Sequence, residues 1–179
     1  KKMSFEEKKT IVLTGMMGSG KTTIGKNLAS KLKRKFFDSD QEVANASGLS
    51  VLEVFQKYGE KYFRSGEKKI ITRLLSMEEK HVLSVGGGAF MNQELREFIN
   101  SNNISVWLDA DCGVLYNRLK NNWKNRPLLN GHNLRDRIKE LLEERRKFYC
   151  LSHIHIKVGK LHANEITHEI MLKLIKKNH

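Results

Sequence analysis

Short apolar runs along the chain alternate with segments in which apolar side chains recur every three or four positions. Ile11–Thr14 has the length and apolar character of a buried strand, whereas Lys21–Leu32 carries its apolar residues on one face of a helix. Ser50 and Glu53 have the spacing of a capping box, which predicts the start of another helix. Strands are predicted in this way at Ile11–Thr14, Lys35–Phe37, His81–Val85, Ile104–Leu108 and Ile154–Val158. Helices are predicted at Lys21–Leu32, from the capping box to Phe55, and at Glu60–Leu75, Asn92–Ile99, Cys112–Leu119, Leu134–Phe148 and Glu165–Ile175.

Alternation of strands and helices is typical of an α/β protein in which helices cover both faces of a parallel sheet. The length of 179 residues suffices for one domain, and we expect residues 1–179 to form a single three-layer unit. In such sheets ligands bind beyond the carboxyl ends of the strands. The residues that follow each predicted strand are therefore the first candidates for chemistry.

The charge of the chain favours anionic ligands. Its 33 basic and 20 acidic side chains give a net charge of +13, which either attracts nucleic acid or steers small anions into a cleft. The basic residues are spread along the whole chain, and the aromatic and basic pattern of an RNA-binding sheet is absent from the sequence. We therefore favour small anions and expect no nucleic-acid partner.

The apolar runs and the cysteines favour a soluble protein of a reducing compartment. No run approaches the roughly 20 apolar residues of a membrane span, so we expect no membrane partner. Lys1–Thr10 is charged and lacks the apolar stretch of a secretory signal. Cys112 and Cys150 are far apart in the sequence, which fits a reducing cytosol and offers no metal-binding pair.

The strongest motif follows the first predicted strand. Gly15–Thr22 has the sequence GMMGSGKT and matches G-x-x-x-x-G-K-[ST] in full, between a strand and a helix as that motif requires. The backbone N–H groups of such a loop and the positive end of the helix dipole surround phosphate oxygens. Lys21 is expected to reach the β- and γ-phosphates, and Thr22 to bind Mg²⁺. The loop indicates a nucleoside triphosphate but does not identify the acceptor of the phosphoryl group.

Two aspartates follow the second predicted strand. In extended backbone Asp38 and Asp40 point the same way, toward the ligand edge of the sheet. One is expected to complete the magnesium shell, and the other to accept a hydrogen bond from an attacking hydroxyl group. An alternative of equal weight is that Asp40 merely caps the next helix.

Further residues suit the recognition of a small polar acid. Gly86–Gly88 follow a strand and leave backbone N–H groups open to close approach. Arg64 and Glu67 lie three positions apart on one helix, either as a partly buried pair or as a surface ion pair. A carboxylate ligand favours two guanidinium groups, which are Arg64 together with Arg145 or Arg146.

A polar, irregular segment lies at Asn121–Asn133 and has the character of a lid that closes over bound phosphates. Arg126 within it is suited to stabilise charge on a transferring phosphoryl group, unless the segment is an ordinary basic loop. His153 and His155 alternate along the last strand, but no third ligand accompanies them, so we expect no metal site there.

In order and spacing these motifs resemble those of the shikimate kinases over nearly the whole chain. The resemblance implies a P-loop fold of the nucleoside monophosphate kinase type, with a five-stranded parallel sheet and a mobile lid at about residues 121–134. It also implies a cytoplasmic monomer that phosphorylates the 3-hydroxyl of shikimate with ATP and Mg²⁺, on the route to chorismate and the aromatic amino acids. The matching segments are Gly15–Thr22, Phe37–Asp40, Gly59–Glu60 with Phe63, Arg64 and Glu67, Gly86–Gly88, Arg126–Leu129, and Arg145 with Tyr149.

The resemblance further implies a role for each site residue. The catalytic residues would be Lys21, Asp40 and Arg126, with Asp40 orienting or deprotonating the attacking hydroxyl. ATP would be bound by Gly18, Ser19, Gly20, Lys21, Thr22, Thr23, Arg118 and Arg126, with Arg118 against the adenine. Shikimate would be bound by Asp40, Arg64, Gly86, Gly87, Gly88 and Arg145. Mg²⁺ would be held by Thr22 and Asp38.

Two other functions stay open on the sequence alone. One is a related kinase for another polyol acid, such as gluconate. The other is a nucleotide-dependent nucleic-acid-binding protein, which would use the net charge of +13.

Overall fold

The computed structural model describes residues 8–131 and 133–177, so most of the charged start at Lys1–Thr10 lies outside the described residues. Five parallel strands form one sheet in the order β2-β3-β1-β4-β5, with the first strand of the chain at its centre. The predicted α/β fold class is confirmed, and each predicted strand is present with its ends shifted by at most two residues. The strands are β1 (Ile11–Thr14), β2 (Phe36–Asp38), β3 (Val82–Ser84), β4 (Ile104–Ala110) and β5 (Ile154–Val158).

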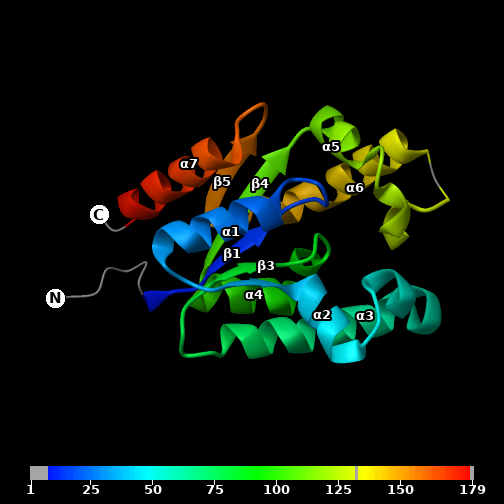
Figure 1. Cartoon of the computed structure of the whole chain (residues 1–179), viewed down its shortest axis with the longest axis horizontal. Coiled ribbons are helices and arrows are strands. Elements are labelled where there is room, and N and C mark those ends of the chain that lie inside the picture. Colours follow the sequence, from blue (N-terminus) through cyan, green and yellow to red (C-terminus); the bar gives the residue numbers. More distant parts are fainter. Residues whose placement is uncertain (1–7, 132, 178–179) are drawn as a thin grey trace.

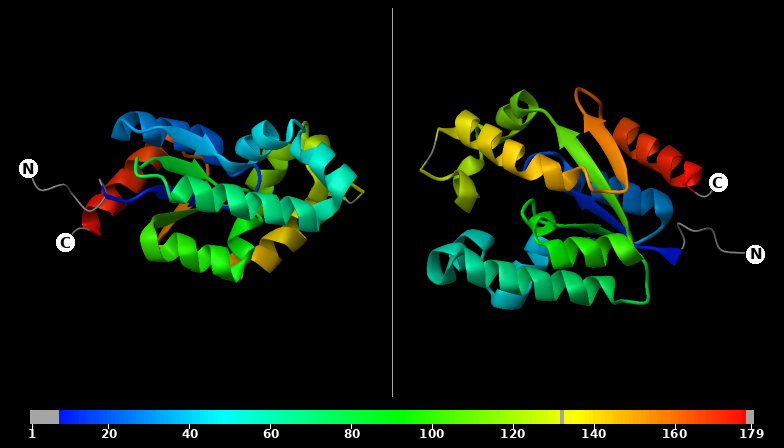
Figure 2. Two further views of the ribbon diagram at one scale, coloured as in Figure 1. Left: turned by 90° about the horizontal axis from the view of Figure 1, so that it is seen from below. Right: turned by 180° about the vertical axis from the view of Figure 1, so that it is seen from behind.

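Helices cover both faces of this sheet (Figures 1 and 2). Helices α1 (Lys21–Leu32) and α7 (Ala163–Lys176) pack together on one face, and α4 (Gln93–Asn102) and α6 (Leu134–Tyr149) lie on the other. All seven residues of β4 are buried, as expected for a strand enclosed from both sides. Among the described residues, no helix has the length and apolar character needed to cross a bilayer.

Two groups of helices flank the carboxyl ends of the strands (Figure 1). Helices α2 (Ser39–Ser47) and α3 (Val51–Leu75) form one group, called here the α2–α3 lobe. Helix α5 (Cys112–Leu119) and the following segment form the other. The segment predicted to be irregular contains two 3₁₀ turns, η3 (Trp123–Asn125) and η4 (Pro127–Leu129), while position 132 lies outside the described residues. A third short turn, η2 (Ala89–Met91), follows β3.

Helix α2 was not predicted from the sequence. Only Ser39 and Val43 in it are buried, so it lacks the apolar periodicity that marks a helix. Its ends are nevertheless defined, because the Asp38 carboxylate caps its first turn and Gly48 ends it with a φ of 70°. The predicted capping box of Ser50 is confirmed at the start of α3.

The helices predicted on either side of Gly59 form one element, α3, which is interrupted at this residue. Gly59 has φ 82° and ψ 170°, a conformation that glycine adopts without steric cost. The α2–α3 lobe has a small apolar core of its own, made by Val43, Val54 and Phe63, apart from the main core. Ile70 packs against both cores and joins the lobe to the sheet.

Candidate active site

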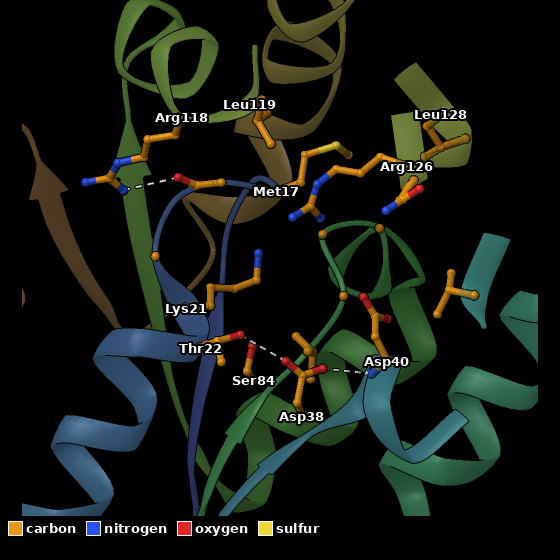
Figure 3. Close-up of a pocket in the computed structure, with 18 of the residues that line it drawn as sticks. Met17, Lys21, Thr22, Asp38, Asp40, Ser84, Arg118, Leu119, Arg126 and Leu128 are labelled. Carbon is orange, nitrogen blue, oxygen red and sulfur yellow. Dashed lines mark hydrogen bonds between the residues drawn. The ribbon is translucent and has the colours of Figure 1, made fainter. Parts of the chain in front are cut away.

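A cavity of about 770 Å³ lies at the carboxyl ends of β1, β2 and β3, between the α2–α3 lobe and the segment that contains η3 and η4 (Figure 3). Strand ends and loops of distant parts of the sequence meet there because parallel strands present their carboxyl ends at one edge. The charged residues lining it are five cations, Lys21, Arg64, Arg118, Arg126 and Arg145, and three carboxylates, Asp38, Asp40 and Glu67. The excess of cations suits an anionic ligand.

The loop from Gly15 to Thr22 forms the floor of the cavity, between β1 and α1 as predicted. A side chain at Gly15 would place its Cβ 2.7 Å from the Leu108 carbonyl oxygen, so this position of the loop requires glycine. The Lys21 ammonium donates to the carbonyl oxygens of Gly15 at 2.7 Å and Met16 at 2.9 Å. Burial lowers the pKa of Lys21 to about 8, with Asp40 acting in the opposite direction.

Thr22 and Asp38 come together at the start of α1. The Thr22 hydroxyl donates to Asp38 Oδ2 at 3.1 Å, while Asp38 Oδ1 accepts from the backbone N–H of Asp40 at 2.9 Å. Ser84, at the end of β3, lies beside them in the cavity wall (Figure 3). Hydroxyl and carboxylate oxygens are the ligands that Mg²⁺ prefers, and it usually takes only one or two from the protein. Within the described residues, no three His, Cys, Asp or Glu side chains are grouped as a metal site.

The two aspartates differ in orientation, which corrects the expectation that both point the same way from extended backbone. Asp38 ends β2, whereas Asp40 lies in the first turn of α2. The capping alternative was also assigned to the wrong residue, because Asp38 caps the helix and Asp40 is free to face the cavity (Figure 3). Burial, and then the charge of Asp38, raises the pKa of Asp40 above its ordinary value.

Arg64 and Glu67 form the partly buried pair that was one of the two expectations. Arg64 Nη1 donates to Glu67 Oε1 at 2.9 Å, and the Glu67 side chain is only 2% exposed. Burial raises the pKa of Glu67 to about 7, with Arg64 opposing this shift. The second carboxylate oxygen of Glu67 has no hydrogen-bond partner within the described residues, and the same holds for the buried Nε of Arg126. Both residues line the cavity.

The glycine triplet packs between these charged groups. A Cβ at Gly88 would lie 2.3 Å from Arg64 Nη2, and one at Gly87 would lie 2.9 Å from Arg145 Nη1. A Cβ at Gly86 would lie 2.6 Å from Glu67 Oε2. The Gly86 N–H donates to the Ser39 hydroxyl at 3.1 Å, which corrects the expectation that all three N–H groups are open.

A family model described as shikimate kinase matches residues 17–175 of the chain. The chain belongs to the shikimate kinase family. A shikimate kinase of Zymomonas mobilis is 45% identical to it over 166 residues, which cover 93% of each chain. A shikimate kinase of Caulobacter vibrioides is 45% identical over 151 residues, which cover 84% of this chain and 74% of that protein.

Solved structures of shikimate kinases have the same fold. The enzyme of Acinetobacter baumannii, solved in complex with shikimate, has a TM-score of 0.91 and 34% identity, covering 97% of this chain and 96% of that one. The enzyme of Aquifex aeolicus has a TM-score of 0.79 and 38% identity, covering 94% and 97%. A gluconokinase of Sinorhizobium meliloti, at 18% identity and a TM-score of 0.64, shares only the fold.

Arg145 and Arg146 were alternative candidates for the second guanidinium of a carboxylate site, and the structure distinguishes between them. Arg145 is 5% exposed and lines the cavity, with Nη1 3.9 Å from Met16 Sδ. Arg146 points elsewhere, because its Nη2 donates to Asp109 Oδ2 at 3.2 Å and its guanidinium lies over the Trp107 ring. His155 binds the same Asp109 oxygen at 2.8 Å, which places this histidine away from the cavity.

The two remaining arginines expected of a shikimate kinase both line the cavity. Arg118, on α5, donates to the Gly18 carbonyl oxygen at 3.1 Å. Leu161, between β5 and α7, and Ala163, the first residue of α7, line the same cavity. Arg126, between η3 and η4, extends toward the space between Lys21 and Asp40 (Figure 3).

The other predicted residues of the phosphate loop, Gly18, Gly20, Thr22 and Thr23, also line the cavity, whereas Ser19 is fully buried beneath the loop.

Ser84 was not predicted from the sequence as a site residue. This residue is 2% exposed and faces Thr22 and Asp38 from the end of β3 (Figure 3). A signal was available, since a serine at the carboxyl end of an otherwise apolar strand sits where ligands of parallel sheets bind.

Proposed function

We propose that this chain transfers the γ-phosphoryl group of ATP to the 3-hydroxyl of shikimate, giving shikimate 3-phosphate and ADP. The proposal is carried by one observation: a single cavity contains the phosphate loop, the Arg64 and Arg145 guanidinium groups, and the Asp40 carboxylate. Transfer between two small substrates requires both to be bound in one water-excluding space.

The acid side of the cavity supports a carboxylated acceptor. Arg64 is oriented by Glu67 at 2.9 Å, and Arg145 is buried beside Gly87. Two guanidinium groups whose positions are fixed by such contacts match a carboxylate through several charge-assisted hydrogen bonds. Gly87 and Gly88 let these arginines approach the backbone, and Asp40 would accept hydrogen bonds from the ring hydroxyls.

The same residues support the chemical step. The pKa of Asp40 is raised by burial, which makes its carboxylate a better proton acceptor for a hydroxyl than an ordinary aspartate. Lys21 and Arg126 face Asp40 from the loop and from the lid segment, where they would stabilise negative charge on the transferring group. Thr22 and Asp38 would hold Mg²⁺, with Ser84 adjacent. When bound, the ion neutralises phosphate charge.

We further propose that residues 1–179 act as one kinase domain whose lid, at about residues 121–134, moves to enclose the substrates. One anchor of that lid is visible, since Leu129 is fully buried and the Leu128 carbonyl accepts from Arg137 Nε at 3.0 Å. Two cysteines that remain free support a cytoplasmic location. We propose a monomer that binds neither nucleic acid nor membranes, because the cations of the cavity account for anion recognition.

The test is ADP release with ATP and Mg²⁺, measured with shikimate, with gluconate, and with no acceptor. We expect release that depends on shikimate and stops when EDTA removes the metal. Equal release with gluconate, or release without any acceptor, would contradict the proposed substrate. A salt-sensitive gel shift with unrelated DNA or RNA at moderate salt would contradict the absence of a nucleic-acid partner.

A further inference from the structure

A buried tyrosine hydroxyl contacts the glycine triplet from the side of the protein core. Tyr149, the last residue of α6, is fully buried, and its hydroxyl donates to the Gly87 carbonyl oxygen at 2.5 Å. The roles proposed above for the site residues make no use of this group. Burying a hydroxyl group costs free energy unless a hydrogen bond compensates for the lost hydration. We therefore asked what the hydrogen bond of Tyr149 contributes to the site.

The ring of Tyr149 has little freedom to move. It packs against Trp107 with ring centroids 5.8 Å apart. Trp107 is itself stacked on His155 at 4.2 Å and covered by the Arg146 guanidinium. Burial raises the pKa of the Tyr149 phenol, with the nearby Arg145 opposing the shift, so the hydroxyl keeps its proton and acts as a donor at neutral pH.

The geometry of a peptide unit makes this hydrogen bond relevant to the cavity. The peptide between Gly87 and Gly88 is trans, so the Gly87 carbonyl and the Gly88 N–H point in opposite directions. The carbonyl points into the core, toward Tyr149, and the N–H therefore points to the opposite side, where Gly87 and Gly88 line the cavity. Within the described part of the chain, the N–H groups of these two glycines donate no hydrogen bond.

Helix α6 also supplies the neighbouring cation. Arg145 lies one turn before Tyr149 on the same helix, and the two side chains enclose Gly87. A Cβ at Gly87 would lie 2.9 Å from Arg145 Nη1, 3.3 Å from the Gly15 carbonyl oxygen and 3.5 Å from the Tyr149 hydroxyl. One helix thus fixes both the Arg145 cation and the direction of a backbone donor.

We propose that Tyr149 is a positioning residue for the acid substrate: its hydroxyl holds the 87–88 peptide so that the Gly88 N–H and the Arg145 guanidinium face the same ligand. This inference rests on the proposed binding of shikimate between Arg64, Arg145 and the glycine triplet. Tyr149 itself does not contact the substrate. We expect its removal to weaken acid binding more than nucleotide binding, because the Tyr149 hydroxyl donates to Gly87 and not to the phosphate loop.

The experiment compares Tyr149→Phe with Tyr116→Phe, a half-buried tyrosine of α5 whose hydroxyl makes no hydrogen bond within the described residues. Dissociation constants for shikimate and for MgADP are measured separately by calorimetry, well below the midpoint of thermal unfolding. For Tyr149→Phe we expect the shikimate Kd to rise about tenfold, equivalent to about 1.4 kcal/mol, with the MgADP Kd within about twofold. Tyr116→Phe should bind both ligands like the wild type.

Several outcomes would overturn the inference. An unchanged shikimate Kd would show that the hydroxyl does not position the acid site. An equal loss of both ligands would show that it holds the fold in general. A wild-type protein that binds no shikimate would instead refute the proposed function, which distinguishes the two failures.

A second measurement covers the case in which Tyr149→Phe does not fold. The sequence contains only two Gly–Gly peptide bonds, 86–87 and 87–88, so glycine labelled with carbonyl ¹³C and ¹⁵N gives just two signals in a carbonyl-selected amide spectrum. In the wild type the Gly88 signal should shift when shikimate is added. A Gly88 signal that does not move while shikimate binds would overturn the inference.

Discussion

Replacing Gly88 with alanine should damage acid binding without damaging the fold. The Cβ of an alanine at this position would lie 2.3 to 2.7 Å from three atoms of the Arg64 guanidinium, which is closer than atoms approach in proteins. The backbone offers no resistance to the change, because Gly88 has φ −89° and ψ −10°, values that alanine adopts readily. The Arg64 side chain, and not the backbone at position 88, therefore has to move.

The magnitude follows from what holds Arg64 in place. To make room it must leave Glu67, to which it donates at 2.9 Å, and with that position it loses the bond to the substrate carboxylate that we propose for it. One charge-assisted hydrogen bond contributes about 1.5–3 kcal/mol, so the KM for shikimate should rise about ten- to 150-fold. The free energy of unfolding should fall only modestly, because the smaller entropy of the unfolded alanine chain, about 0.4–1 kcal/mol, offsets part of the loss of the Arg64–Glu67 pair.

Gly66→Ala is the matched control, since Gly66 lies on the same helix as Arg64 and a Cβ there would meet nothing within 4 Å. Steady-state kinetics with varied shikimate and with varied ATP, together with thermal unfolding, measure the three quantities. We expect only Gly88→Ala to raise the KM for shikimate, with the KM for ATP unchanged in both variants. A KM for shikimate within twofold of wild type in Gly88→Ala would refute the assignment of Arg64 to the acid.

The other predictions concern the charged groups of the cavity. Asp40→Asn should abolish most turnover while MgADP still binds by calorimetry, because only the group facing the acceptor changes; full turnover would remove Asp40 from the mechanism. Arg145→Ala should raise the KM for shikimate at least tenfold, whereas Arg146→Ala, which loses contacts with Asp109 and Trp107, should stay within about threefold; a reversed order would contradict the choice between them. Glu67→Gln should change the pH dependence of stability. Because burial raises the pKa of Glu67 from 4.5 in the unfolded chain to about 7, wild type binds this proton more tightly when folded and loses up to about 3 kcal/mol as pH rises through that range. Glutamine does not ionise, so the free energy of unfolding of the variant, measured with urea, should rise relative to that of wild type between pH 5 and pH 8. A difference in free energy that stays constant over this range would contradict the raised pKa of Glu67.

Much of the fold was predictable because parallel sheets are buried on both faces. A strand such as β4, with every residue buried, appears in the sequence as a short and mostly apolar run that contains only two polar residues, Ser105 and Asp109. Helix α2 could not be found in the same way, since its buried face consists of Ser39 and Val43. Its signals are the capping aspartate and the final glycine, which also occur in loops.

The phosphate loop was predictable for a different reason. Its function depends on backbone geometry, so glycines at fixed spacing identify it. The direction of a single side chain carries no such pattern. Whether Asp38 or Asp40 caps α2 depends on where β2 ends, and the predicted end at Phe37 differs from the observed end at Asp38 by one residue. Arg145 and Arg146 are adjacent and differ by about 100° around the helix, so only the packing of α6 decides which one faces the cavity.

The separate apolar core of the α2–α3 lobe has a consequence for how such an enzyme can change. Asp40 and Arg64 belong to a unit packed around Val43, Val54 and Phe63, whereas the phosphate loop belongs to the sheet and its main core. Ile70 packs against both cores, and Ile71, Leu74 and Leu75 at the end of α3 belong to the main core. Substitutions at Val43, Val54 or Phe63 can therefore shift Asp40 and Arg64 without repacking the main core. Arg145 and the glycine triplet, the other groups proposed to bind the acceptor, lie outside this lobe. One part of the acceptor site can thus vary while the other part stays fixed.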